Sequence, residues 1–147
     1  MQLLQFVSSS VAAGFLVATA ALAQSANYAS YETTTDKPVQ LGYYASAHKN
    51  CTPAALPTVR VLEAPKGGVL IVRKGVLATD QVAGCTGLKT PAQIAFYQPR
   101  AGYTGPDRVS YEVTSENGDV ATYEMTITVK AAPATTPPAD DPKGKSL

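Results

Sequence analysis

Apolar and polar residues alternate along two segments near the end of the folded part of the chain. The first runs from Arg108 to Thr114 and the second from Tyr123 to Lys130. Successive side chains of a strand point to opposite faces, so each segment is predicted to be a β-strand with one buried and one solvated side. The predicted buried positions are Val109, Tyr111, Val113, Tyr123, Met125, Ile127 and Val129. The Asn117-Gly118 dipeptide between the segments is typical of a hairpin turn.

Other segments are also predicted to be extended. Gln93 to Tyr97 alternates in the same way, and Val39 to Ala47 is a weaker candidate. Thr58 to Glu63 and the apolar run Val69 to Val72 flank a Pro/Gly turn, which predicts a hairpin whose second strand is buried on both sides. After the first 24 residues no apolar stripe of helical period exceeds two turns, so the predicted fold class is all-β.

The two ends of the chain differ in composition from the middle. Leu3 to Ala23 is an uncharged run ending in Ala21-Leu22-Ala23, which predicts a secretory signal peptide over residues 1–23. A membrane anchor is the alternative, but serines and alanines dilute the run and no basic cluster follows it. Residues 24–37 are expected to be a flexible lead-in, residues 38–130 the domain, and residues 131–147 a disordered Pro/Thr-rich tail. We therefore expect a secreted or periplasmic protein with no stable membrane span after cleavage.

The charge and the cysteine content of the chain limit the compartments and the classes of partner that are expected. The 12 Lys and Arg residues are scattered among 11 Asp and Glu residues, for a net charge of +1, so nucleic acid is not an expected partner. The chain contains two cysteines, Cys51 and Cys85, and an exported protein meets oxidants, so one disulfide is predicted between them. Closing a loop of about 34 residues would stabilise the fold by about 3–4 kcal/mol.

The segment from Arg73 to Pro91 has no clear period and is predicted to be a long loop that Cys85 pins. Such a loop is either a recognition element or a device that stabilises a small core. Its candidate binding residues are Lys74, Leu77, Asp80, Gln81 and Lys89.

The turn residues between Thr58 and Val129 form an ordered series. Pro65-Lys66-Gly67 precedes the short apolar strand, and then come Tyr97-Gln98-Pro99, Gly102-Tyr103-Thr104-Gly105-Pro106-Asp107 and the Asn117-Gly118 hairpin. This series resembles the bacterial Ig-like, cadherin-like tandem-repeat domains of secreted and surface proteins. The resemblance implies an Ig-like antiparallel β-sandwich, present here as a single copy with a lengthened connection before Tyr97.

The corner from Gly102 to Asp107 carries the most specific part of the resemblance. Gly102 and Gly105 allow backbone angles closed to other residues, Tyr103 can tuck its ring under the turn, and Asp107 can accept backbone N–H bonds. In such domains this corner is structural, so the resemblance implies a scaffold role for these four residues.

The sequence offers few residues for chemistry. With one histidine, His48, and both cysteines expected in a disulfide, a zinc or copper site is not expected. Glu116, Asn117 and Asp119 form only a polar hairpin tip, without the Asp-rich linkers through which cadherin-like domains bind calcium. Gly84-Cys85-Thr86 is superficially similar to the nucleophile of cell-wall transpeptidases, but the flanking residues of those enzymes are missing. No catalytic residue, metal or cofactor is therefore predicted.

These observations predict a non-catalytic secreted or periplasmic Ig-like binding or structural module. It is expected to engage an envelope or extracellular protein or polysaccharide, through the disulfide-held loop at residues 73–91 or through an exposed edge strand. A calcium-stabilised adhesion or matrix module is the alternative, and a cell-wall enzyme acting through Cys85 is a third reading.

Overall fold

The structure, a computed structural model, describes residues 25–80 and 84–134. The predicted signal peptide lies outside these ranges, as does most of the predicted tail. The strands are β1 (Ala26–Thr34), β2 (Val39–Ala45), β3 (Thr58–Glu63), β4 (Gly68–Thr79), β5 (Leu88–Pro99), β6 (Gly105–Thr114) and β7 (Val120–Lys130). Within the described ranges, no helix is long and apolar enough to cross a membrane.

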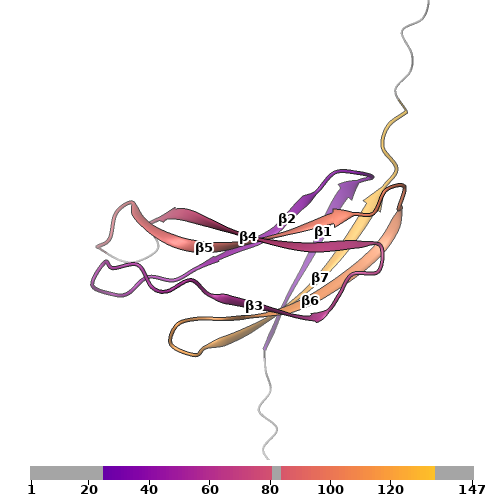
Figure 1. The fold of residues 1–147 in the computed structure, drawn as a ribbon. Helices are drawn as coiled ribbons and strands as arrows, with labels where there is room; N and C mark the ends of the chain where they lie inside the picture. Colours follow the sequence, from indigo (N-terminus) through magenta and orange to yellow (C-terminus); the bar gives the residue numbers. More distant parts are fainter. Residues whose placement is uncertain (1–24, 81–83, 135–147) are drawn as a thin grey trace, which may run out of the picture.

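The strands form two sheets that pack face to face (Figure 1). One sheet has the order β1-β7-β6-β3 and the other the order β2-β5-β4. Chain connections repeatedly cross from one sheet to the other, as in seven-stranded Ig-like sandwiches. The predicted fold class, an Ig-like β-sandwich with one disulfide, is therefore confirmed.

Strand β1 corrects the expectation of a flexible lead-in at residues 24–37. It pairs in parallel with β7, from Ala26 opposite Thr122 to Thr34 opposite Lys130, whereas the other paired strands are antiparallel. The Tyr31 hydroxyl donates a hydrogen bond to the Leu41 carbonyl and so links β1 to the other sheet. The sequence does not reveal β1 as a strand. An edge strand presents few side chains to the core, so β1 is polar and lacks the apolar alternation that predicts a strand.

Strands β3 and β4 do not form the predicted hairpin. β3 pairs with β6 and β4 pairs with β5, so the connection between β3 and β4 passes from one sheet to the other. Nor is β4 buried on both sides, because it is an edge strand whose Val69 and Val76 side chains are 53% and 71% exposed. β4 also continues to Thr79 and β5 begins at Leu88, so the predicted loop at 73–91 shortens to residues 80–87.

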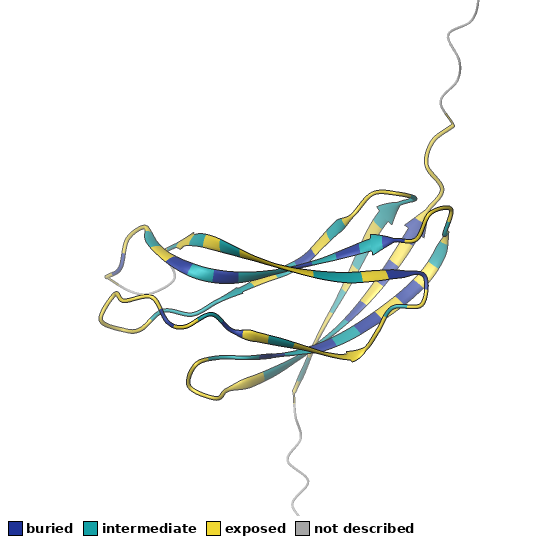
Figure 2. Ribbon diagram, in the orientation of Figure 1, coloured by how far each residue is buried: buried dark blue, intermediate teal, exposed yellow. Residues whose placement is uncertain are grey.

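The hairpin of β6 and β7 confirms the prediction from alternation. Ser115 N–H donates to the Asp119 carbonyl over 2.9 Å, Gly118 N–H donates to the Ser115 carbonyl over 3.0 Å, and Gly118 has φ 86°. One face of each strand is buried, as the alternating colours along β6 and β7 show (Figure 2). The core of the sandwich consists of Leu41, Ala95, Tyr97, Val109, Tyr111, Val113, Met125, Ile127 and Val129.

A buried carboxylate ties the two sheets together where the chain crosses between them. Asp107 is 6% exposed and accepts backbone N–H bonds from Lys66 (3.0 Å), Gly67 (2.8 Å) and Arg108 (2.9 Å). The Tyr97 hydroxyl, from the other sheet, donates to it over 2.8 Å. Burial by itself raises the pKa of Asp107, but these four hydrogen bonds outweigh it, and the pKa lies below its ordinary value.

Tyr103 closes the turn beside this carboxylate. Its ring lies against Gly67, where a Cβ atom would come within 2.3 Å of the ring, and its hydroxyl donates to the Pro106 carbonyl. Gly102 and Gly105 adopt φ 74° and 117°, in the region that favours glycine.

Asp107→Asn should lower the free energy of unfolding by about 2–4 kcal/mol, because an amide presents N–H groups to two of the four donors. Denaturant titration should show a lower midpoint with an unchanged slope. The wild-type protein should lose stability as the pH falls below about 4, through the depressed folded-state pKa of Asp107, and the variant should lack this component.

Asp36→Asn is the matched control. Asp36 lies in an exposed turn at φ 66°, which Asn tolerates equally well, so its effect should stay below about 0.5 kcal/mol. Equal effects of the two substitutions would contradict the role assigned to Asp107.

Candidate functional site

Three chain connections meet at one end of the sandwich, on the left in Figure 1. They are residues 46–57 between β2 and β3, the described residues 80 and 84–87 between β4 and β5, and residues 115–119 between β6 and β7. We call this set of segments the loop end. In Ig-like sandwiches, loops gathered at one end of the sheets form a common surface for ligands.

The disulfide lies at the loop end and joins two of its segments. Cys51 and Cys85 are bonded with S–S 2.07 Å and Cα–Cα 5.3 Å, which confirms the predicted pairing. Cys85 is 5% exposed, whereas Cys51 is exposed and has φ 62°. The bridge therefore holds the β2–β3 connection against the β4–β5 connection.

Polar contacts join the third segment to the first. His48 Nε2 lies 3.1 Å from Glu116 Oε2, and Ala55 N–H donates to the same carboxylate oxygen over 3.0 Å. Within the β4–β5 connection, Gly87 N–H donates to Asp80 Oδ1. Each of the three segments thus has internal bonds that involve its described residues.

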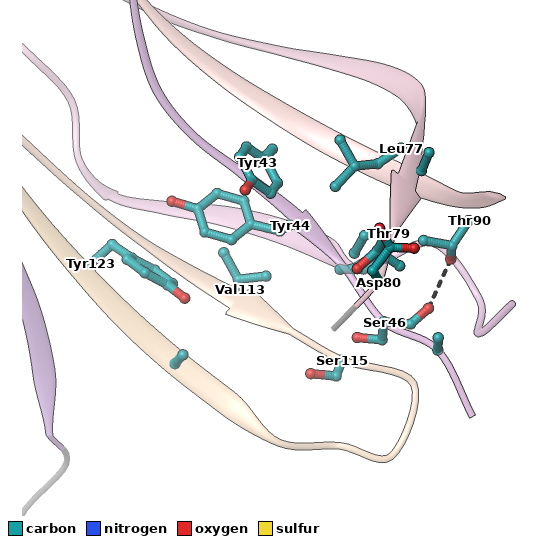
Figure 3. A pocket seen from close by; sticks show the side chains of 15 residues that line it. Tyr43, Tyr44, Ser46, Leu77, Thr79, Asp80, Thr90, Val113, Ser115 and Tyr123 are labelled. Carbon is teal, nitrogen blue, oxygen red and sulfur yellow. Dashed lines mark hydrogen bonds between the residues drawn. The ribbon is translucent and has the colours of Figure 1, made fainter. Parts of the chain in front are cut away.

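A cleft of about 410 Å³ opens between the sheets at the loop end (Figure 3). Its volume falls within the range of about 300–1,000 Å³ that is usual for small-molecule sites. The lining residues come from both sheets: Tyr43, Tyr44, Ala45, Ser46, Ala47, Pro57, Leu77, Ala78, Thr79, Asp80, Thr90, Val113, Ser115, Ala121 and Tyr123.

Large side chains fill the space between the sheets in the core, whereas small side chains contribute much of the lining of the cleft. Tyr97 and Ile127 occupy the core and are fully buried. Among the residues that line the cleft are four alanines and two serines, Ala45, Ala47, Ala78, Ala121, Ser46 and Ser115. The side chains at this end leave part of the space between the sheets unfilled.

Three tyrosines separate the core from the cleft. The Tyr111 ring stacks on Tyr123 at 5.6 Å between centroids, and Tyr44 meets Tyr111 edge-on at 5.9 Å. The Tyr44 and Tyr111 hydroxyls lie 2.6 Å apart and share a hydrogen bond. Burial raises the pKa of Tyr111 to about 12 and also raises those of Tyr44 and Tyr123, so all three phenols stay protonated at neutral pH.

A second hollow, of about 580 Å³, adjoins the cleft at the loop end. Ser46, Ala47 and Ser115 line both hollows. The second hollow is otherwise lined by residues of two loops, His48, Ala54, Glu116, Asn117 and Asp119. The two hollows therefore lie on either side of residues that they have in common, and the second one reaches the residues of the hairpin tip.

The predicted binding residues occupy different elements from the loop in which they were expected. Lys74 and Leu77 lie on β4, Asp80 follows it, and Lys89 lies on β5, while Gln81 is outside the described residues. Leu77 and Asp80 line the cleft, whereas Lys74 and Lys89 do not. The sequence predicts an inward-facing Tyr123 but does not mark Tyr44, Ser115 or Tyr123 as site residues, because nothing local to them indicates a cleft.

The residues considered for catalysis or metal binding have other bonding partners in the structure. Cys85 is bonded to Cys51 and offers no thiolate, and His48 pairs with Glu116 instead of with a nucleophile. Asn117 Nδ2 donates to Asp119 Oδ2 at the hairpin tip. Within residues 25–80 and 84–134, no three His, Cys, Asp or Glu side chains converge in a way that could hold a metal ion.

Comparison with known proteins identifies no family. No protein-family model matches the chain, and no curated protein shows significant sequence similarity to it. Among solved structures, the chain is similar to a 2,6-sialyltransferase of Vibrionaceae Photobacterium sp. JT-ISH-224, with 10% identity and a TM-score of 0.36. The match covers 76% of this chain and 19% of that enzyme, and so weak a likeness carries no functional argument.

Replacing both cysteines by serine should lower the free energy of unfolding by about 3–4 kcal/mol, because the bridge closes a loop over a sequence separation of 34 residues. Hydrogen exchange should accelerate at residues 46–57 and 84–87 more than in β6 and β7. Reductant should destabilise the wild-type protein to a similar extent and leave the double variant unchanged. A loss below about 1 kcal/mol would contradict the clamping role.

Proposed function

We propose that this protein is a non-catalytic binding module of the cell envelope, secreted or periplasmic, of the bacterial Ig-like, cadherin-like type. It engages an envelope protein or polysaccharide through the loop end. The observation that carries this proposal is the cleft, bounded by loops that a disulfide and the Glu116 contacts hold in place.

The bonds between the described residues of the loop end favour binding over a purely structural role. A surface that is already ordered loses little conformational freedom when a partner docks, so more of the contact energy appears as affinity. The Cys51–Cys85 bond and the two contacts of Glu116 supply that order. A module that served only as a spacer would gain nothing from a cleft left unfilled between its sheets.

The free edge of β4 is a second candidate surface. Its Val69 and Val76 side chains are exposed, and strand addition at such an edge is a common way of capturing an extended peptide. Arg73 and Lys74 are also exposed on this strand, and basic residues on edges discourage pairing with other strands.

The proposal is tested by immobilising the protein and measuring how much of a partner it captures from a native envelope fraction. Ser115→Arg places a long charged side chain where both hollows meet and should lower capture by about tenfold or more, as expected for a residue at the centre of a contact. Thr128→Arg is the matched control: Thr128 is exposed on β7, opposite Pro106 and away from the loop end, and the variant should capture as the wild-type protein does.

The double variant Val69→Lys, Val76→Lys distinguishes the edge of β4 from the loop end. Capture should survive this change. Loss of capture in the edge variant together with full capture by Ser115→Arg would transfer the binding role to β4. Unaltered capture by all variants would reject both surfaces.

Melting curves separate this proposal from a calcium-stabilised module. The melting temperature should be the same with millimolar calcium chloride and with excess chelator. A calcium ion bound at about 100 times its Kd would add about 2.7 kcal/mol, which for a domain of this size raises the melting temperature by several degrees. A rise of that size with calcium would favour the adhesion or matrix module.

A further inference from the structure

The cleft contains hydroxyl groups that the fold does not use. Tyr123, Ser46 and Ser115 line it, and within the described residues their hydroxyls have no hydrogen-bond partner. By contrast, the Tyr44 hydroxyl bonds with Tyr111, and Thr90 Oγ1 donates to the Ser46 carbonyl over 2.8 Å. Figure 3 shows the Tyr123 hydroxyl directed into the space beside Val113, and the Tyr44 hydroxyl directed away from it.

The charge of the lining limits the class of ligand. No lysine or arginine lines either hollow, and the cleft carries one carboxylate, Asp80, which accepts the Gly87 N–H. An anionic ligand would meet a negative charge without a compensating cation. A lone cation would find one carboxylate in the cleft, already hydrogen-bonded, while Glu116 and Asp119 lie in the second hollow, and no three such groups converge within the described residues as a metal ion requires.

The polarity of the lining limits the class of ligand further. A purely apolar ligand would displace water from the free hydroxyls without replacing their hydrogen bonds, which costs free energy for each group. A neutral ligand that carries several hydroxyls of its own can replace those bonds. Its carbon-bound hydrogens can at the same time pack against tyrosine side chains, which present an apolar body beside a polar tip.

We propose that the cleft binds a neutral sugar residue of an envelope polysaccharide, with Tyr123, Ser115 and Ser46 as its hydrogen-bonding residues. This inference rests on the proposed binding function and selects polysaccharide over protein as the partner. The adjoining hollow favours a chain over a single sugar, because the two hollows share Ser46, Ala47 and Ser115 and one linear ligand can occupy both. His48, Asn117 and Asp119 in that hollow are polar groups for a neighbouring unit.

Titration of the full chain with cellotetraose, maltotetraose and chitotetraose tests the inference, with tetragalacturonate as the anionic comparison. The chain has eight tyrosines and no tryptophan, so tyrosine fluorescence and calorimetry can both report binding. At least one neutral tetrasaccharide should bind, and tetragalacturonate should bind more weakly. In parallel, polysaccharide freed of protein from the envelope should compete for capture of the module.

Tyr123→Phe removes one hydroxyl and keeps the ring that stacks on Tyr111, so it should weaken the binding of sugar about five- to tenfold with an unchanged melting temperature. Ser115→Ala should act similarly. Tyr28→Phe is the matched control, because Tyr28 is 74% exposed on β1 and is not part of the cleft, and it should bind as the wild-type protein does.

The outcomes separate this inference from the proposed function. The sugar inference would be overturned if the partner proved to be a protein. In that case Ser115→Arg would abolish capture, protease treatment of the envelope fraction would destroy it, and purified polysaccharide would not compete. The proposed binding module would remain intact. Sugar binding that Tyr123→Phe and Ser115→Ala leave unchanged would also overturn it. Absence of any capture, by protein or by polysaccharide, would overturn both.

Discussion

Asp107 joins separate parts of the chain through one buried carboxylate. Its oxygens accept hydrogen bonds from the β3–β4 connection, from the start of β6 and from Tyr97 on β5 in the facing sheet. A buried charge of this kind is costly unless its hydrogen bonds are complete, so the carboxylate favours the arrangement that supplies all four donors. That arrangement sets the closed end of the sandwich, where the chain crosses between sheets.

The two ends of the sandwich are stabilised in different ways. At the end that contains Asp107, the Tyr97 hydroxyl donates to the carboxylate, and the Tyr103 ring occupies the place where a side chain at Gly67 would lie. At the loop end, a cleft separates the sheets, and small residues contribute much of its lining. A covalent bond between Cys51 and Cys85 supplies the order there, supported by the His48 and Ala55 contacts of Glu116. Covalent and polar bonds between the loops thus stabilise the loop end, although the cleft leaves the space between the sheets there unfilled.

The alternation of residues was a reliable guide only for strands that have one face on the core. β6, β7 and the second half of β5 were predicted for that reason, together with the turn at Gly118. The edge strands were not. β1 is polar and pairs in parallel with a strand almost a hundred residues away, and β4 extends to Thr79 through a segment whose glycine and exposed charges obscure its period. The apparent hairpin of β3 and β4 failed because a Pro/Gly connection looks the same whether the chain turns back within a sheet or crosses to the other.

The sequence by itself determined the all-β class, the β6–β7 hairpin, the pairing of the two cysteines and the residues of the Asp107 corner, because each depends on local pattern or on a choice without alternatives. It could not determine which strands are neighbours or which residues meet at the loop end. Tyr44, Ser115 and Tyr123 lie far apart along the chain and belong to different strands and loops, and only the stacking of the sheets brings them to one cleft. Only the tertiary structure decided the candidate site. A cleft is space that side chains leave unfilled, and this space exists only once both sheets are in place.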